Sequence, residues 1–177
     1  MYPTAYIDFL VQFHSVRDYF ECHEILEDHW KAAPPSERKK HWAGLIQLAV
    51  ALYHERRQNI VGAERMMNRA EKIISEEKEP LKALAIDVEK LLLLIQQRKL
   101  DIHRGVRYQD INIPLTDSDL VTLCCRKSVE LGAAWRSESD LSNSFLIHRH
   151  ILRDRTDVVE EREAQRLIRK KKKLSGG

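Results

Sequence analysis

The run from Trp42 to His54 constrains the fold more than any other part of this 177-residue chain. Within it only Gln47 and His54 are polar, so a helix here has no broad face to leave in water. Such a helix is buried only if other helices surround it. The sequence therefore predicts a bundle built around this central helix.

Amphipathic segments flank the central helix, and each repeats its apolar residues at the helical period. Turn and stop signals such as Pro34-Pro35 and Gln58-Asn59 leave only a few residues between segments, and short connections favour antiparallel neighbours. The clearest apolar stripes are Ala63, Met66, Met67, Ala70, Ile73 and Ile74 in the segment 61–78, and Leu81, Leu84, Val88, Leu91, Leu92 and Ile95 in the segment 81–99. Further helices are predicted over about 4–14, 18–31, 36–57, 117–131 and 145–173. We predict an all-α fold: an antiparallel helical bundle of about five helices with a C-terminal helical extension.

The helical period is lost after residue 100, and this loss divides the chain. Residues 101–115 alternate only briefly and end near Pro114, and Thr116-Asp-Ser-Asp119 is a capping-box pattern that starts another helix. We predict a helical bundle domain over 1–100, a linker or cover segment over 101–116, and a helical extension with a basic tail over 117–177.

Composition argues against membrane and disulfide-rich classes. No stretch approaches about 18 uncharged apolar residues, so no transmembrane helix is expected. The N-terminus lacks a signal-peptide order because Asp8 interrupts its apolar run. Three cysteines, two of them adjacent, do not form a disulfide framework. The expected location is the cytoplasm.

The positive net charge belongs to the end of the chain. Residues 1–99 carry equal numbers of basic and acidic side chains, whereas the run Arg169 to Lys173 is entirely basic. This run is a solvated helix end or makes a weak nucleic-acid contact through phosphates. The long C-terminal helix loses its apolar positions after Val159, so it is also a candidate surface for a protein partner or for a homo-oligomer.

The helix 18–31 carries the strongest functional signal. At 100° per residue, His23 and Glu27 fall at the centre of the face that also holds its large apolar residues, and Trp30 follows one turn later. A charged group is not buried without a partner. The helix therefore needs a polar network, a ligand or a metal ion at this place.

The central helix offers the counterpart. Gln47 and His54 share one of its faces with small residues that let another helix approach. If the two helices pack antiparallel, His23 lies level with Gln47 and Glu27 faces Ala43 and Gly44, so that a Glu27–Gln47–His23 cluster forms easily. A metal ion held by His23, Glu27 and His54 together needs a steeper helix crossing.

Three interpretations of this cluster stay open: a buried structural network, a ligand or substrate pocket, and a divalent metal site. The pattern differs from the zinc-protease H-E-x-x-H motif because Glu27 stands where the second histidine belongs. No cofactor follows from the sequence. The candidate site residues are His23, Glu24, Glu27, Trp30, Gln47 and His54.

The motifs His23-Glu24-x-x-Glu27-x-x-Trp30, Gly44-Leu-Ile-Gln47 through His54, and Asn59-x-x-Gly62-Ala63 occur in this order. With them, residues 6–80 resemble the small helical family known as domain of unknown function 309. The resemblance implies an all-α, cytoplasmic, mainly prokaryotic protein, and it implies no established activity, substrate or cofactor. By position, it marks His23, Glu24, Glu27, Trp30, Gln47, His54, Asn59 and Gly62.

Two functions are consistent with these residues. The first is a non-enzymatic interaction or structural module with a buried His/Glu/Gln network. The second is a small metal-dependent or hydrolase-like enzyme. In that enzyme Glu24 or Glu27 acts as general base with the help of His23, because burial raises a carboxyl pKa toward neutrality.

Overall fold

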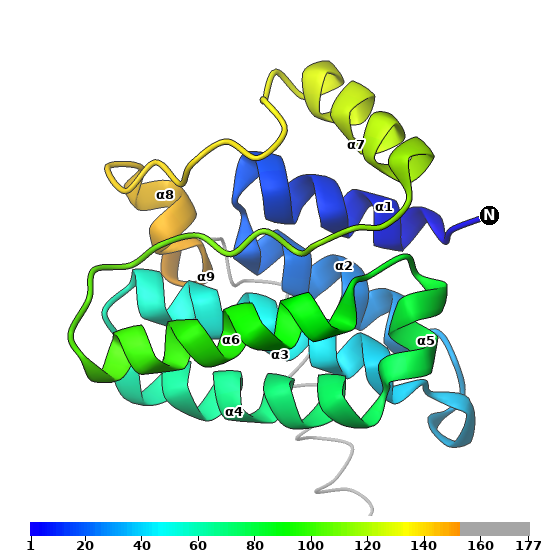
Figure 1. Ribbon diagram of the computed structural model, residues 1–177. Helices are drawn as coiled ribbons and strands as arrows, with labels where there is room; N and C mark the ends of the chain where they lie inside the picture. Colours follow the sequence, from blue (N-terminus) through cyan, green and yellow to red (C-terminus); the bar gives the residue numbers. More distant parts are fainter. Residues whose placement is uncertain (153–177) are drawn as a thin grey trace, which may run out of the picture. The chain divides into compact units, whose positions relative to one another are not determined.

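A computed structural model describes residues 1–152, and this part of the chain is all-α (Figure 1). Residues Met1–Ile147 form one compact unit, and a second unit begins at His148. The predicted all-α class is confirmed, whereas the predicted domain boundaries stay a prediction. The helices are α1 (Thr4–Val11), α2 (Tyr19–Lys31), α3 (Lys40–Arg56), α4 (Ile60–Glu76), α5 (Lys78–Ala83), α6 (Val88–His103), α7 (Ser118–Glu130), α8 (Ser144–Ile147) and α9 (Arg149–Leu152), with a π-helical turn over Gln12–Val16 and a 3-10 turn over Pro35–Glu37.

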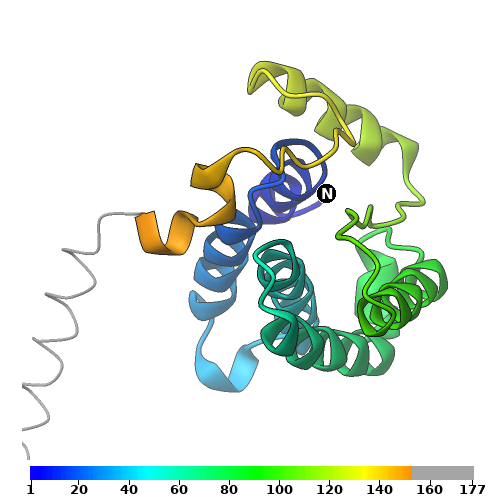
Figure 2. The same cartoon turned by 90° about the vertical axis from the view of Figure 1, so that its left-hand side faces the viewer.

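Helix α3 is the central element of the first unit. It packs between α2 and α4, while α6 packs on α4, α1 on α2, and α7 on α1 (Figure 2). Most of its side chains are buried, and the half-buried positions are Ala43, Gln47, Val50 and His54. These positions recur at the helical period, so they form the one face of α3 that reaches the surface.

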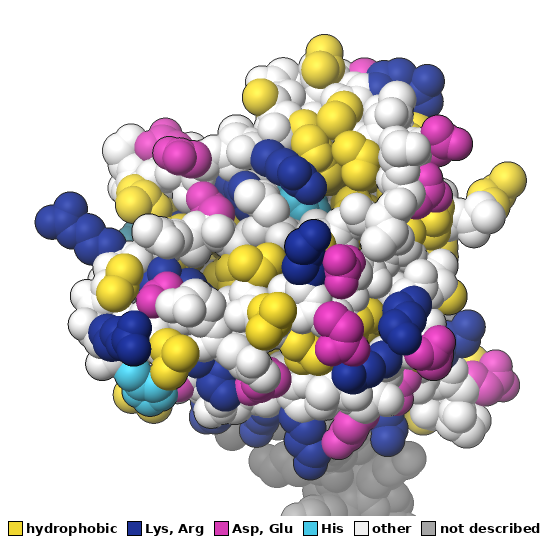
Figure 3. Space-filling view, viewed as in Figure 1, with side chains coloured by type: hydrophobic (Ala, Val, Ile, Leu, Met, Phe, Trp, Pro, Cys, Tyr) yellow, Lys and Arg dark blue, Asp and Glu magenta, His cyan; other side chains and the backbone are white. Residues whose placement is uncertain are grey.

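The predicted apolar stripes of α4 and of the segment after it are buried. All six residues of the second stripe are at most 9 % exposed, and only Ile73 of the first is half-buried. At Gly44 a Cβ atom would lie 3.1 Å from Cγ2 of Ile73. This small residue is therefore what lets α3 and α4 approach closely. On the face in Figure 3, acidic and basic side chains are interspersed over α4 and α6, consistent with the zero net charge of residues 1–99.

The prediction of a single helix over 81–99 is wrong, because the structure has two helices there, α5 and α6. Ala85 takes a positive φ of 58°, and Ile86 forms an isolated antiparallel bridge with Leu115. The amide of Asp87 donates to the carbonyl of Pro114 at 2.9 Å. The break is therefore stabilised by a segment that lies about thirty residues further along the chain, which local periodicity does not report.

The segment after α6 covers the core rather than leaving it. Ile111 and Ile113 are 5 % and 0 % exposed, and Figure 1 shows the segment crossing between α6 and α1 before α7 begins. The helix that follows is capped by Asp117, whose carboxylate accepts from the amides of Asp119 and Leu120. This cap lies one residue after the predicted capping residue, Thr116.

The long helix predicted over 145–173 begins as two short helices, α8 and α9, in the described residues. The remainder of that prediction, including the basic run Arg169 to Lys173, lies outside the described residues. None of the described helices has both the length and the apolar character needed to cross a membrane.

Candidate functional site

His23, Glu24 and Glu27 of α2 form a compact polar cluster. Nδ1 of His23 lies 2.9 Å from Oε1 of Glu24, and its Nε2 lies 3.7 Å from Oε2 of Glu27. One potential ligand atom from each residue lies within 4.8 Å of the others. The imidazole is thus flanked by a carboxylate at each ring nitrogen. Oε1 of Glu27 also forms an ion pair with Nζ of Lys31 at 2.9 Å, one turn further along the helix.

The cluster is not at the centre of the buried face, and this part of the prediction is wrong. The buried residues of α2 are Tyr19, Cys22 and Leu26, whereas His23 and Glu27 keep 28 % and 31 % of their side-chain surface exposed. The segment 18–31 is helical as predicted, and Asp18 caps it through the amide of Glu21 at 3.0 Å. The buried stripe is rotated toward Cys22 because α1 also packs on this helix, which leaves the cluster at the edge of the core.

The antiparallel register of α2 and α3 lies close to the predicted one. The ring of Phe20 lies 6.2 Å from that of Tyr53, and the ring of His29 lies 5.0 Å from that of Trp42. Counted along both helices from these two contacts, Gln47 lies about level with Ile25, whereas the prediction placed it level with His23.

Two other predicted site residues carry buried polar atoms without partners. Oε1 of Gln47 and Nε1 of Trp30 have no hydrogen-bond partner among the described residues. In the predicted Glu27–Gln47–His23 cluster, Oε1 of Gln47 therefore accepts no hydrogen bond. Trp30 is half-buried against the core, and Arg38 lies over its ring at 5.2 Å.

His54 lies outside the cluster. Its Nδ1 is 3.0 Å from Nδ2 of Asn59, and Asn59 caps α4 by accepting from the amide of Gly62 at 3.1 Å. Burial lowers the pKa of His54, and the nearby charges of Arg57 and Arg65 lower it further. His54 with Asn59 and Gly62 therefore forms the turn between α3 and α4.

A buried polar network that the sequence analysis missed lies between the π-helical turn and the cover segment. Asp110 accepts hydrogen bonds from the hydroxyls of Tyr19 and Tyr108 at 2.8 and 2.7 Å, and from the amide of Ser139 at 2.7 Å. Burial raises the pKa of Asp110, but the bonds from Ser139 and Tyr108 and the charge of Arg17 hold it below its ordinary value. The carboxylate is thus a structural acceptor.

Arg17 is the cation of this network, and it is only 2 % exposed. Its guanidinium donates to the carbonyls of Ser137, Phe13 and Ile111 at 2.7, 2.9 and 3.2 Å, and to Oδ1 of Asn112 at 2.8 Å. Its backbone has a φ of +60°. No local sequence signal points to most of these contacts, because the carbonyls of Ser137 and Ile111 come from segments about a hundred residues away.

A second buried ion pair joins α3 to α6. Oε1 of Glu55 lies 2.8 Å from Nε and 2.6 Å from Nη2 of Arg98, and both side chains are 3 % exposed. Burial raises the pKa of Glu55, and the hydrogen bond and charge of Arg98 oppose this rise. Here the sequence did hold a signal: Arg98 falls on the same helical stripe as Leu91, Ile95 and Ile102.

His14 and the cysteines are accounted for by packing. His14 is fully buried, with Nδ1 2.9 Å from the carbonyl of Leu10, and burial lowers its pKa to about 3. Cys22 and Cys124 are buried free thiols, and Cys125 is half-buried and also free. These residues offer no second candidate site.

Comparison with known proteins places the chain among uncharacterised proteins. The family model described as domain of unknown function (DUF309) matches residues 6–66. The chain is 50 % identical over 174 residues to the uncharacterized protein YpuF of Bacillus subtilis (strain 168), and the match covers 97 % of this chain and 98 % of that protein. No solved structure matches. The matched model includes the whole His23–Glu24–Glu27 cluster, and the near full-length similarity to YpuF extends beyond it: the chain belongs to the DUF309 family.

Proposed function

We propose that this protein binds a divalent transition-metal ion through His23, Glu24 and Glu27 on α2. The proposal rests on one observation: an imidazole nitrogen and two carboxylate oxygens lie within 4.8 Å of one another. Imidazole and carboxylate are common ligands of zinc, iron and manganese. Three protein ligands leave coordination positions open for water or for a substrate. We propose binding of the ion and no particular reaction.

The distribution of buried polar groups supports this function over a purely structural one. The buried charges include Arg17, with the part-buried carboxylate of Asp110 nearby, and Glu55 with Arg98, and these join distant segments. The three residues of the cluster are instead close neighbours on a single helix, and each is about one-third exposed. Exposed ion pairs contribute little to stability. A part-exposed cluster that gathers one imidazole and two carboxylates on a single helix is better suited to binding.

The proposed site also limits the enzymatic alternative. A carboxylate that is bound to an ion does not serve as a general base at the same time. If the protein is a metal-dependent enzyme, then Glu24 and Glu27 are ligands, and the water on the ion supplies the nucleophile.

Metal titration tests the proposal directly. We expect isothermal titration calorimetry of the protein with zinc, cobalt and manganese to show one site per chain for at least one ion. His23→Ala should weaken that binding at least about tenfold, because even outer-shell partners of a metal site are worth about 10–100-fold in affinity. His103→Ala is the matched control, since this histidine is 66 % exposed and lies on α6. Absence of a stoichiometric site, or equal losses in both variants, would rule the proposal out.

A non-enzymatic interaction role is the second candidate, and one observation favours it. Four large apolar side chains between residues 141 and 152 are more than half exposed: Leu141, Phe145, Ile151 and Leu152. Leu141 and Phe145 belong to the first unit and Ile151 and Leu152 to the second, and exposed apolar side chains so close in the sequence favour contact with a partner or with a second copy of the chain. Light scattering that shows a monomer at all concentrations would argue against self-association.

The free thiols support the further proposal of a reducing, cytoplasmic location.

A further inference from the structure

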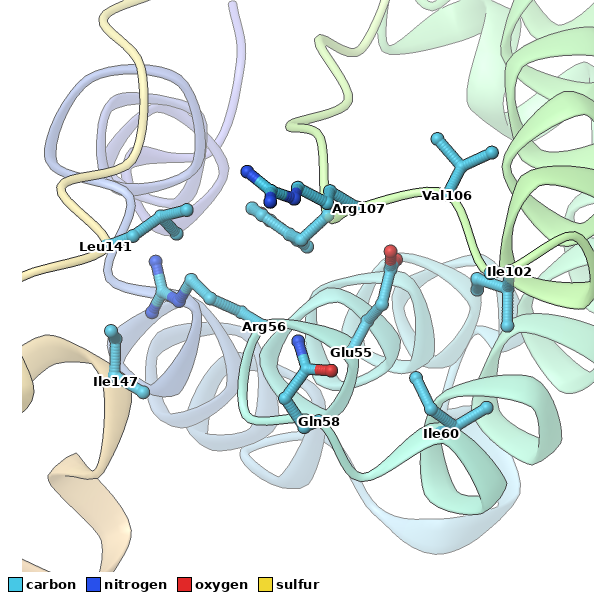
Figure 4. A pocket seen from close by; sticks show the side chains of 11 residues that line it. Glu55, Arg56, Gln58, Ile60, Ile102, Val106, Arg107, Leu141 and Ile147 are labelled. Atoms are coloured by element: carbon cyan, nitrogen blue, oxygen red, sulfur yellow. The ribbon is translucent and has the colours of Figure 1, made fainter.

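A cavity of about 530 Å³ lies where the end of α3, the start of α4 and the end of α6 meet (Figure 4). Its size falls within the range of small-molecule pockets, about 300–1,000 Å³. The His23–Glu24–Glu27 cluster does not line it, and the proposed metal function does not use it. Its apolar walls are Ile60, Ile102, Val106, Leu141 and Ile147.

Two residues that line it each carry a buried polar atom that has no partner among the described residues. Both contacts from Arg98 fall on Oε1 of Glu55, so Oε2 of Glu55 is left without a donor. Arg56 donates through Nη1 to the carbonyl of Arg17 and through Nη2 to that of Leu146, but its Nε has no acceptor. Both side chains are at least 95 % buried. A buried polar atom without a partner is costly, and in native proteins it points to a ligand, an ion or water.

The charges of the cavity are divided between two sides. In Figure 4 the carboxylate of Glu55 lies near Ile102 and Val106, whereas the guanidinium groups of Arg56 and Arg107 lie toward Leu141. Arg98 already neutralises Glu55, so Arg56 and Arg107 make the cavity positive overall. Arginine side chains are well suited to bind carboxylate and phosphate groups.

We propose that this cavity binds a small organic anion with an apolar body. Its carboxylate or phosphate group lies at Arg56 and Arg107, and a hydrogen-bond donor at its other end reaches Glu55. The branched aliphatic walls contact the apolar body between these two ends. Arg107 lines the cavity and is exposed, so its charge attracts the anion from solvent.

Calorimetric titration with two matched pairs of probes tests this ligand class on the full chain. The carboxylate pair is ε-aminocaproate and caproate, and the phosphate pair is phosphoethanolamine and ethyl phosphate. Within each pair only the donor at the far end changes. We expect the amine-bearing probe of at least one pair to bind at least about tenfold more tightly than its partner, and the pair that binds identifies the anionic group. Failure of all four probes to bind, or equal affinities within both pairs, would overturn the proposal.

Arg107→Ala tests the anion end without removing a buried group. We expect it to weaken binding of the preferred probe about tenfold or more, because a charge-assisted hydrogen bond is lost. Arg104→Ala is the matched control, since Arg104 is also exposed and lies three residues away but does not line the cavity. Equal effects of the two variants would show that general surface charge causes the binding, and would overturn the site. His23→Ala should leave probe binding unchanged, which keeps this test separate from that of the metal site.

Discussion

Replacing Arg98 with methionine is expected to lower the free energy of unfolding by about 3–5 kcal/mol, as is typical when one partner of a buried ion pair is removed. The carboxylate of Glu55 stays 97 % buried and loses both of its contacts to the guanidinium. The carbonyls of Val106 and Arg107 lose their donor as well. Urea unfolding at neutral pH measures the loss.

Two further variants separate the buried charge from a general effect of losing a cation. Lys99→Met lies next to Arg98 on α6 and breaks a part-exposed pair with Glu71, so it should cost less than about 1 kcal/mol. The double variant Glu55→Gln with Arg98→Met should recover part of the stability, because no charge remains unpaired. A double variant that is less stable than Arg98→Met alone would contradict this account.

The deficit of Arg98→Met should also depend on pH. Burial raises the pKa of Glu55, and Arg98 is the influence that lowers it. Without Arg98 the folded-state pKa therefore rises further above the unfolded value of about 4.3. A carboxyl group whose pKa is raised in the folded state lowers the free energy of unfolding only where it is ionised. The stability that Arg98→Met loses should therefore grow as the pH rises from the unfolded-state pKa of Glu55 through its folded-state pKa. Unfolding at about pH 4.5 should show a smaller difference from wild type than unfolding at about pH 7.

Replacing Arg17 with methionine is expected to lower the free energy of unfolding by a similar amount, about 3–5 kcal/mol. The guanidinium donates to two buried carbonyls, those of Phe13 and Ile111, and to two part-buried acceptors, the carbonyl of Ser137 and Oδ1 of Asn112. It also lies 3.9 Å from the carboxylate of Asp110. Methionine fills part of the volume but donates no hydrogen bond. Each of these acceptors then loses its donor, and those of Phe13 and Ile111 stay buried.

Arg136→Met is the matched control for this variant. Arg136 also has a φ of +60°, and it lines the same surface cavity as Arg17, but its side chain is exposed. Its replacement should change stability by no more than about 0.5 kcal/mol. Comparable losses in both variants would mean that the hydrogen bonds of Arg17 are not the cause.

The elements that local periodicity controls could be predicted from the sequence. The buried stripe from Ala63 to Ile74 and the apolar positions from Leu81 to Ile95 repeat every three or four residues, and burial follows this repeat. The central position of α3 followed from its lack of polar residues. These features depend on each helix alone.

The features that distant segments control could not be predicted. The break at Ala85 depends on pairing with Leu115, and the burial of Arg17 depends on carbonyls near residues 111 and 137. The prediction that α2 turns His23 and Glu27 toward the core was wrong for the same reason. A helix with apolar residues on more than one side can turn either stripe inward, and its neighbours decide which one is buried. The three residues of the cluster were still identified together, because Glu27 follows His23 by four residues and Glu24 by three, spacings at which side chains are neighbours on a helix.

The most direct test of this account is to measure metal affinity and stability on the same variant, Glu27→Gln. Glu27 is part-exposed rather than a core residue, and as a proposed ligand its replacement is predicted to weaken metal binding at least about tenfold. The free energy of unfolding of the metal-free protein should change by no more than about 0.5 kcal/mol. A loss of about 1–3 kcal/mol in stability, with metal affinity unchanged, would contradict the assignment of this cluster as a binding site.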